Sequence, residues 1–232
     1  KGKEDPLTSY TQQVVITEYA TAVDAGYPLD RQRAFFSIED EVKDKLTTKI
    51  AEKMVELEFD VLKASPTKQF YGGTAGSDGA LGASDFLTPT LLSKARTWAV
   101  TGGKRAQSPI EPIMVEGFGN YFLLFIHPEV GYDLRRDSNW VQAVREADVR
   151  GPQNPLFTGA RMIYDGVVAI ETEWAPLYTT ADSWGTNGAR CLLVGKSALL
   201  KASCKAPEVT QVYDAYNRKL SYGVSMMLGV SK

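Results

Sequence analysis

Residues 37–65 read SIEDEVKDKLTTKIAEKMVELEFDVLKAS, and this stretch decides the fold. Its apolar residues recur at helical spacing, at Ile38, Val42, Leu46, Ile50, Met54, Leu57 and Val61. Ser37 with Asp40 three residues later is a variant of the capping box, and neither Gly nor Pro interrupts the stretch before Pro66. The pattern predicts one amphipathic helix over 37–64. We expect Val42, Leu46, Ile50 and Met54 to face a β-sheet of the same subunit.

The segment 10–23, YTQQVVITEYATAV, precedes this helix. It is rich in Val, Ile, Thr and Tyr and contains neither Gly nor Pro, which favours an extended strand. A lone ribbon strand is not stable in water. Because only a polar stretch precedes it in this sequence, we expect its partner strand to lie upstream of Lys1.

The rest of the chain alternates helical and strand patterns. Five glycines in 71–84 predict a mobile surface loop and a boundary between subdomains. Thr88 as N-cap and Pro89 as first residue predict a helix that ends at Gly102-Gly103. Further elements are expected as a hairpin of 113–115 with 121–126, a short helix at 139–147, and strands at 167–174, 190–194 and 220–230. Without a regular βαβ rhythm, this order favours the α+β class.

Composition excludes several classes of protein. The 26 Lys and Arg balance 28 Asp and Glu, giving a net charge of -2, and no basic arm exists for nucleic-acid phosphates. One histidine and two cysteines are too few for a structural zinc site, which needs about four ligands. The longest apolar run, 121–126, is far shorter than the roughly 20 residues that span a bilayer. We therefore expect no cofactor, no metal, no membrane and no sequence-specific nucleic acid, and reduced thiols at Cys191 and Cys204.

Three chemical motifs are incomplete. Gly195-Lys196-Ser197 resembles the end of a phosphate-binding loop, but Arg190 stands where that loop needs glycine. His127, followed by Pro128, is more typical of a structural residue than of a general base. Glu171 and Glu173 share a strand face, which a solvated surface explains. No catalytic residue is assigned and an enzyme is not expected; a nucleotide-binding or hydrolytic α+β enzyme is the alternative from another class.

Three stretches carry a family resemblance. They are His127-Pro128 with 133–137 and Trp140; the run NPLFTGA at 154–160 with YDGVV at 164–168; and DAYNR at 214–218 with 222–224 and 229–232. Together they resemble the major capsid proteins of tailed bacteriophages, in the family typified by the N-four-like coliphages. The resemblance covers nearly the whole chain.

This resemblance implies the Hong Kong 97 capsid fold, with an extended loop, a peripheral domain and an axial domain. Residues 1–24 would be the returning half of the extended loop. Residues 25–84 would be the peripheral domain with the spine helix 37–64 and the glycine-rich loop. Residues 85–204 would form the axial domain with its supporting helix, and 205–232 would return to the peripheral sheet.

The implied function is self-assembly into an icosahedral shell that encloses a double-stranded DNA phage genome. Its partners would be copies of itself in hexamers and pentamers, with portal and cement proteins. Its location would be the virion, after assembly in the host bacterial cytoplasm. Tyr10, Val14, Ile16 and Tyr19 are too apolar for a solvated tail, so we expect this inter-subunit arm to contact an adjacent subunit. An encapsulin-like compartment of the same fold is the alternative.

Overall fold

The computed structural model describes residues 12–25, 38–105, 109–115, 119–146, 162–182, 184–214, 216 and 219–232. The chain divides into two compact units. The first unit comprises Lys1–Val61 and Leu199–Lys232, and the second unit comprises Leu62–Ala198. The two units thus divide between Val61 and Leu62, within the long helix. The sequence led us to expect the boundary further along the chain, in the glycine-rich loop 71–84. Tyr10, the cap residue Ser37 and the run 154–160 lie outside the described residues.

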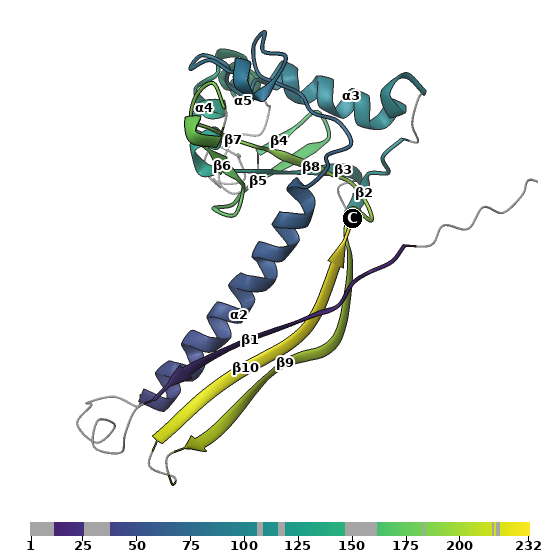
Figure 1. Cartoon of the computed structure of the whole chain (residues 1–232). Coiled ribbons are helices and arrows are strands. Elements are labelled where there is room, and N and C mark those ends of the chain that lie inside the picture. The colour runs from purple at the N-terminus through teal and green to yellow at the C-terminus, as the bar shows by residue number, and fades with distance from the viewer. Residues whose placement is uncertain are drawn as a thin grey trace, which may run out of the picture. The chain divides into compact units, whose positions relative to one another are not determined.

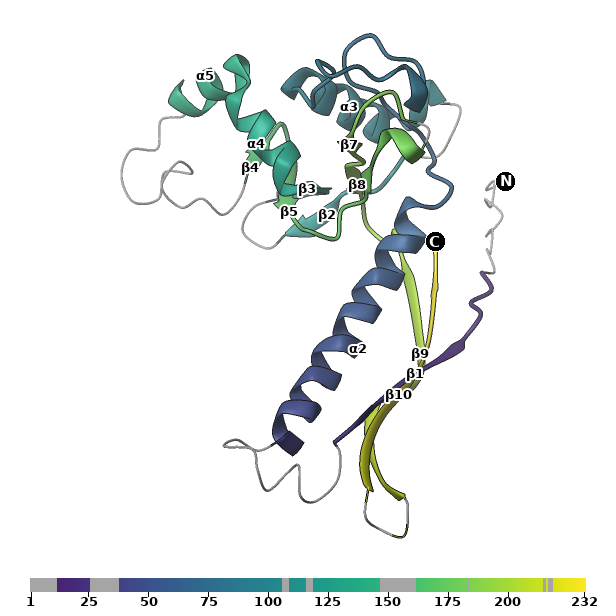
Figure 2. The same cartoon turned by 60° about the vertical axis from the view of Figure 1, so that its left-hand side comes forward.

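The first unit contains a three-stranded antiparallel sheet with a helix along one face (Figures 1 and 2). Its elements are β1 (Thr17–Asp24), α2 (Ile38–Lys63), β9 (Leu200–Asp214) and β10 (Lys219–Ser231). The strand order is β1-β10-β9, and β1 pairs from Thr17 opposite Leu228 to Asp24 opposite Ser221. The prediction that the partner of this strand lies upstream of Lys1 is therefore wrong, because β10 is its partner.

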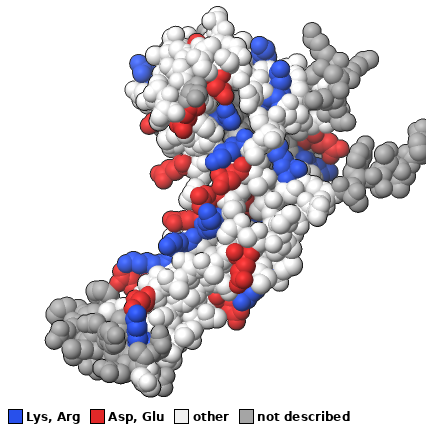
Figure 3. Space-filling model, in the orientation of Figure 1, with Lys and Arg blue, Asp and Glu red and all other residues white. Residues whose placement is uncertain are grey.

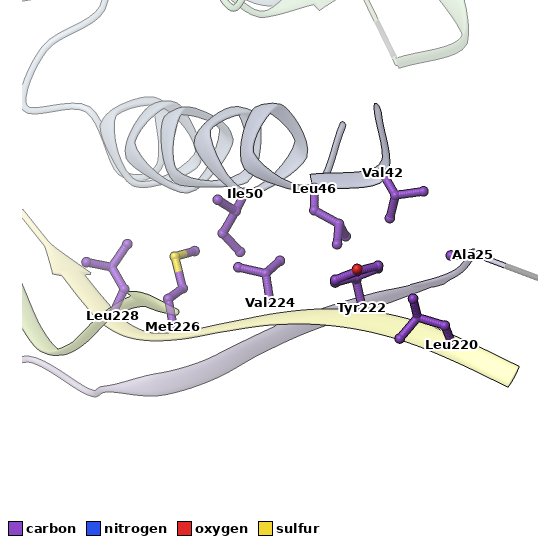
Figure 4. Close-up of a cluster of buried hydrophobic side chains, with 9 residues drawn as sticks. All are labelled: Ala25, Val42, Leu46, Ile50, Leu220, Tyr222, Val224, Met226 and Leu228. Atoms are coloured by element: carbon purple, nitrogen blue, oxygen red, sulfur yellow. The ribbon is translucent and has the colours of Figure 1, made fainter. Parts of the chain in front are cut away.

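The core of the first unit lies between one face of α2 and one face of β10 (Figure 4). Alternate residues of β10 point to the helix because successive side chains of a strand face opposite sides. The buried cluster consists of Ala25, Val42, Leu46, Ile50, Leu220, Tyr222, Val224, Met226 and Leu228. Met54 packs against it while partly buried. The predicted helix and its predicted inward face are confirmed.

The second unit is built on a mixed sheet. Its strands are β2 (Ile113–Val115), β3 (Gly119–Ile126), β4 (Met162–Tyr164), β5 (Val167–Glu171) and β8 (Leu192–Val194). The order is β2-β3-β5-β4, with β8 also paired to β3. β3 and β5 are parallel, and the β2–β3 pair is the predicted hairpin. The core joins Leu92 and Ala99 of the helix α3 (Pro89–Arg105) to β3 and β5.

The other helices of the second unit test the predicted boundaries. In α3, Thr88 Oγ1 accepts a hydrogen bond from the Leu91 N–H at 3.3 Å, so the predicted cap is confirmed, but the helix continues through Gly102 to Arg105. α5 (Ser138–Glu146) is the predicted short helix. The sequence did not predict α4 (Pro128–Arg136). Short elements complete the unit: β6 (Leu177–Tyr178), β7 (Gly188–Ala189) and 3-10 turns at Asp78–Ala80 and Thr180–Asp182. The class is α+β, as predicted.

Candidate assembly site

His127 has a structural role at the start of α4. It is the N-cap residue, and its Nδ1 accepts a hydrogen bond from the Glu129 N–H at 3.3 Å. An N-cap acceptor satisfies one of the amide donors that the first turn of a helix leaves unpaired. The structural interpretation of His127 made from the sequence is therefore the one that the geometry supports.

The Gly195-Lys196-Ser197 motif forms a turn between β8 and β9. The Lys196 N–H donates to the Glu111 carbonyl at 2.8 Å, and Ser197 adopts a left-handed φ of 58°. A Cβ at position 195 would lie 2.5 Å from Ile110 Cγ2, so the glycine permits this close packing. A phosphate-binding loop opens a helix and offers its amide groups to the ligand. Here the chain enters a strand and the amide is already bonded.

Glu171 and Glu173 do not form a carboxylate pair. Glu171 makes an ion pair with Arg135 of α4, and the missing side chain of Gly131 leaves room for its carboxylate. Glu173 lies beyond the end of β5 and is exposed. Glu171 therefore ties α4 to the end of the sheet, while Glu173 remains a surface residue.

Part of the glycine-rich loop 71–84 contacts residues from the end of the second unit, while most of its residues are exposed. Arg190 Nη2 lies 3.2 Å from Asp78 Oδ2, and the guanidinium covers the ring of Tyr178, which stacks on Trp184. The Gly185 N–H donates to the Asp78 carbonyl at 3.1 Å. These contacts are made by residues a hundred positions later in the chain, so the glycine composition of the loop could not reveal them.

The two thiols are free and have different surroundings. Burial raises the pKa of Cys191 to about 12, whereas Cys204 is exposed on β9. Within the described residues, no group of three or more His, Cys, Asp or Glu side chains is placed to hold a metal ion. Among the same residues, none of the helices combines the length and apolar content needed to cross a membrane.

Charge is evenly mixed on the surface that Figure 3 draws. Blue and red side chains alternate there, without an extended area of either sign among the described residues of this face. On α2 the exposed pairs include Lys45 with Glu41, and Lys53 Nζ with Glu56 Oε2 at 2.7 Å. Exposed pairs of this kind stabilise a fold by at most about 1 kcal/mol.

The predicted arm is divided between two environments. Tyr19, in β1, is partly buried and packs against the core of its own unit. Val14 is half-buried, and Ile16 is 40% exposed. Val15, which the sequence reasoning did not single out, is 74% exposed. In the run Val14-Val15-Ile16 all residues are aliphatic, so alternation could not identify the exposed ones.

Exposed apolar side chains also lie near the turn of the β9–β10 hairpin, on both faces of β9. Val209 and Tyr213 share one face, Val212 is on the other face, and Tyr216 is in the turn; Tyr213 is 54% exposed. Figure 2 shows this end of the hairpin extending past the first turn of α2. Sequence reasoning missed it, although the Val-Tyr content of 209–216 was a signal.

Comparisons with known proteins identify the family and the fold of the chain. The sequence model of the family described as "Phage capsid protein" matches residues 60–232. The major capsid protein of Pseudomonas phage KPP25 is 23% identical over 273 residues, covering 100% of this chain and 72% of that protein. The capsid of Ralstonia phage GP4 is 20% identical with a TM-score of 0.78, over 96% of this chain and 70% of that one. A holo-SrpI encapsulin complex from Synechococcus elongatus PCC 7942 is 18% identical, with a TM-score of 0.56. The match covers 94% of this chain and 70% of that chain.

The fold is thus the Hong Kong 97-like fold of shell-forming proteins. The chain belongs to the phage capsid protein family. The function predicted from the sequence, that of a phage major capsid protein, is confirmed, and the encapsulin alternative is not favoured. The protein is a structural component of a phage capsid.

Proposed function

We propose that the protein assembles as hexamers and pentamers of itself into an icosahedral shell around a double-stranded DNA genome. On this proposal residues 1–24 are the returning half of an extended loop, 25–84 belong to the peripheral domain, 85–204 to the axial domain, and 205–232 return to the peripheral sheet. Assembly would take place in the cytoplasm of the host bacterium. A portal and cement proteins are the further partners.

The near-neutral charge supports a shell that is built first and filled afterwards. A coat protein that condensed its own genome would need many cationic groups to neutralise phosphates. This chain has a net charge of -2, and its charges are mixed on the face shown in Figure 3. DNA would therefore enter through the portal instead of being gathered by the coat.

One observation carries the proposed contact between subunits: Val15 and Ile16 are exposed immediately before β1. Tyr19, three residues after Ile16, is by contrast partly buried against the core of its own unit. Covering exposed aliphatic side chains with another surface is favourable, by about 25 cal/mol per Å² of apolar area removed from water. We assign that surface to an adjacent subunit, with Val14, Val15 and Ile16 as contacts.

The test is the double variant Val15→Asp with Ile16→Asp in the full-length protein. Sedimentation velocity and electron microscopy should show shells for the wild type and free subunits or capsomers for this variant. Far-ultraviolet circular dichroism should be unchanged, because both side chains lie outside the core cluster. The matched control is Val15→Ile with Ile16→Val, which keeps the apolar surface and should assemble. Closed shells from the aspartate variant would contradict the proposed contact.

A further inference from the structure

The chain crosses the face of β10 just before β1 begins. The β1–β10 ladder starts with Thr17 opposite Leu228, so residues before Thr17 are outside the ladder. They nevertheless remain close to β10, because Gln12 Nε2 donates to Ser231 Oγ at 2.9 Å. In Figure 1 the purple segment passes across the β9–β10 ribbon on its way toward the N-terminus. The crossing point is therefore bounded by Leu228 and Ser231.

Gly229 lies at this crossing point. A Cβ at position 229 would lie 2.5 Å from the Val15 carbonyl oxygen and 2.7 Å from Val14 Cγ1. Both separations are below 3.0 Å, which real Cβ atoms essentially never show. One of the two partners is a backbone atom, so a change of rotamer cannot relieve the contact. Any side chain at 229 must push residues 14 and 15 away from β10.

Gly223, on the same strand, shows that the requirement is local. A Cβ there would lie 3.4 Å from Thr210 Oγ1 and 3.8 Å from the Thr21 carbonyl oxygen, so a methyl group fits with little adjustment. Position 223 lies opposite Ala22 in the regular ladder, whereas position 229 lies where the chain leaves it. Glycine is thus required where the chain crosses β10, at position 229, and not in the regular part of the strand, at position 223.

We propose that Gly229 is a positioning residue that fixes the direction in which the arm before β1 leaves the subunit. This inference rests on the proposed function, in which Val15 and Ile16 contact an adjacent subunit. Val15 is both the residue whose carbonyl lies on Gly229 and the most exposed of the arm side chains described above. A displacement at the crossing point therefore moves the contact residue itself. An extended chain advances about 3.3 Å per residue, so a change of direction at the crossing displaces residues further along the arm by larger distances.

The experiment traps the crossing by a chemical cross-link in the full-length protein. Gln12→Cys and Ser231→Cys replace the two hydrogen-bonded side chains, in a Cys204→Ser background that removes the exposed natural thiol. With Gly229 present, a short bifunctional thiol reagent, which makes up the length lost when Gln12 becomes Cys, should cross-link positions 12 and 231 within one subunit, seen as a mobility shift in denaturing gels, and shells should still form. Adding Gly229→Ala should abolish the cross-link and the shells. Adding Gly223→Ala should leave both unchanged.

Circular dichroism of each variant separates a misdirected arm from a misfolded unit, because α2 keeps its signal when only the arm moves. Gly229→Ala that cross-links and assembles as well as Gly223→Ala overturns the inference. Loss of α2 helicity in Gly229→Ala also overturns it, since the residue would then support the fold and not the arm. Failure of the proposed function has a different signature: the Val15→Asp, Ile16→Asp protein forms shells while Gly229→Ala still loses the cross-link.

Discussion

Leu46 and Ile16 are aliphatic side chains of the same unit with opposite surroundings. Leu46 has no exposed surface and packs with Leu220 and Tyr222, whereas Ile16 is 40% exposed beside an edge strand. The difference shows that the α2–β10 cluster stabilises the subunit alone, while the segment 12–16 has surface left for another molecule. Substitutions in the cluster should therefore change folding, and substitutions in the segment should change assembly.

The largest effect on folding is expected for Leu46→Ala. Removing a fully buried leucine side chain leaves a cavity under β10, so the free energy of unfolding should fall by about 2–5 kcal/mol. Urea unfolding monitored by circular dichroism measures it. The matched control is Leu200→Ala, since Leu200 of β9 is 45% exposed and should cost under about 0.5 kcal/mol. Equal losses for the two variants would show that the cluster is not the core.

Gly131→Ala should have the next largest effect. The added methyl group would collide with the Glu171 carboxylate, which must then leave Arg135 or force α4 away from the sheet. The clash is with the end of a flexible, exposed side chain, so the expected cost is the loss of this ion pair, at most about 1 kcal/mol. Gly76→Ala is the control, because a Cβ there meets nothing within 4 Å. Equal melting temperatures for the two variants would contradict the close contact between Gly131 of α4 and Glu171.

Part of this architecture could be predicted from the sequence because its signals are local. The period of apolar residues in 37–64 identified α2, and the Thr88-Pro89 pair located the start of α3. β9 was missed as a continuous strand because it contains Pro207 and several charged residues, which are tolerated at a sheet edge but weaken the strand pattern. α4 was missed because His127-Pro128 looked like a turn.

The candidate site was less predictable, since it depends on contacts between distant parts of the chain. The pairing of β1 with β10 joins the two ends of the sequence, and nothing in the composition of 10–23 indicates that partner. The same limit applies to Tyr19, which has the character of an interface residue but lies against its own core. Gly229 is one glycine among 20, and only the crossing of Val15 distinguishes it.

The two thiols extend the comparison to pH. Burial raises the pKa of Cys191 from 9.0 to about 12, so the folded state keeps its proton where the unfolded chain has lost it. The free energy of unfolding should therefore contain a contribution that is complete below pH 9 and is lost as pH rises toward 12. Cys191→Ala should remove this part of the alkaline decline, and Cys204→Ser should retain it. Identical alkaline unfolding curves for the two variants would contradict the assigned burial.

Tyr213→Ser should have the smallest effect on folding. Tyr213 is 54% exposed near the turn of the β9–β10 hairpin, so the free energy of unfolding should change by less than about 0.5 kcal/mol. If this surface is covered in the shell, the same variant should raise the protein concentration needed for assembly, measured by sedimentation. A large loss of stability would mean that the hairpin surface belongs to the fold of the isolated subunit.

The most direct measurement is a cryo-electron microscopy map of shells assembled from the full-length protein, at a resolution that traces side chains. We predict that Val15 and Ile16 are covered by an adjacent subunit, that the chain crosses β10 at Gly229, and that Leu46 remains against β10 of its own subunit. Shells in which Val15 and Ile16 face solvent in every subunit would contradict the account.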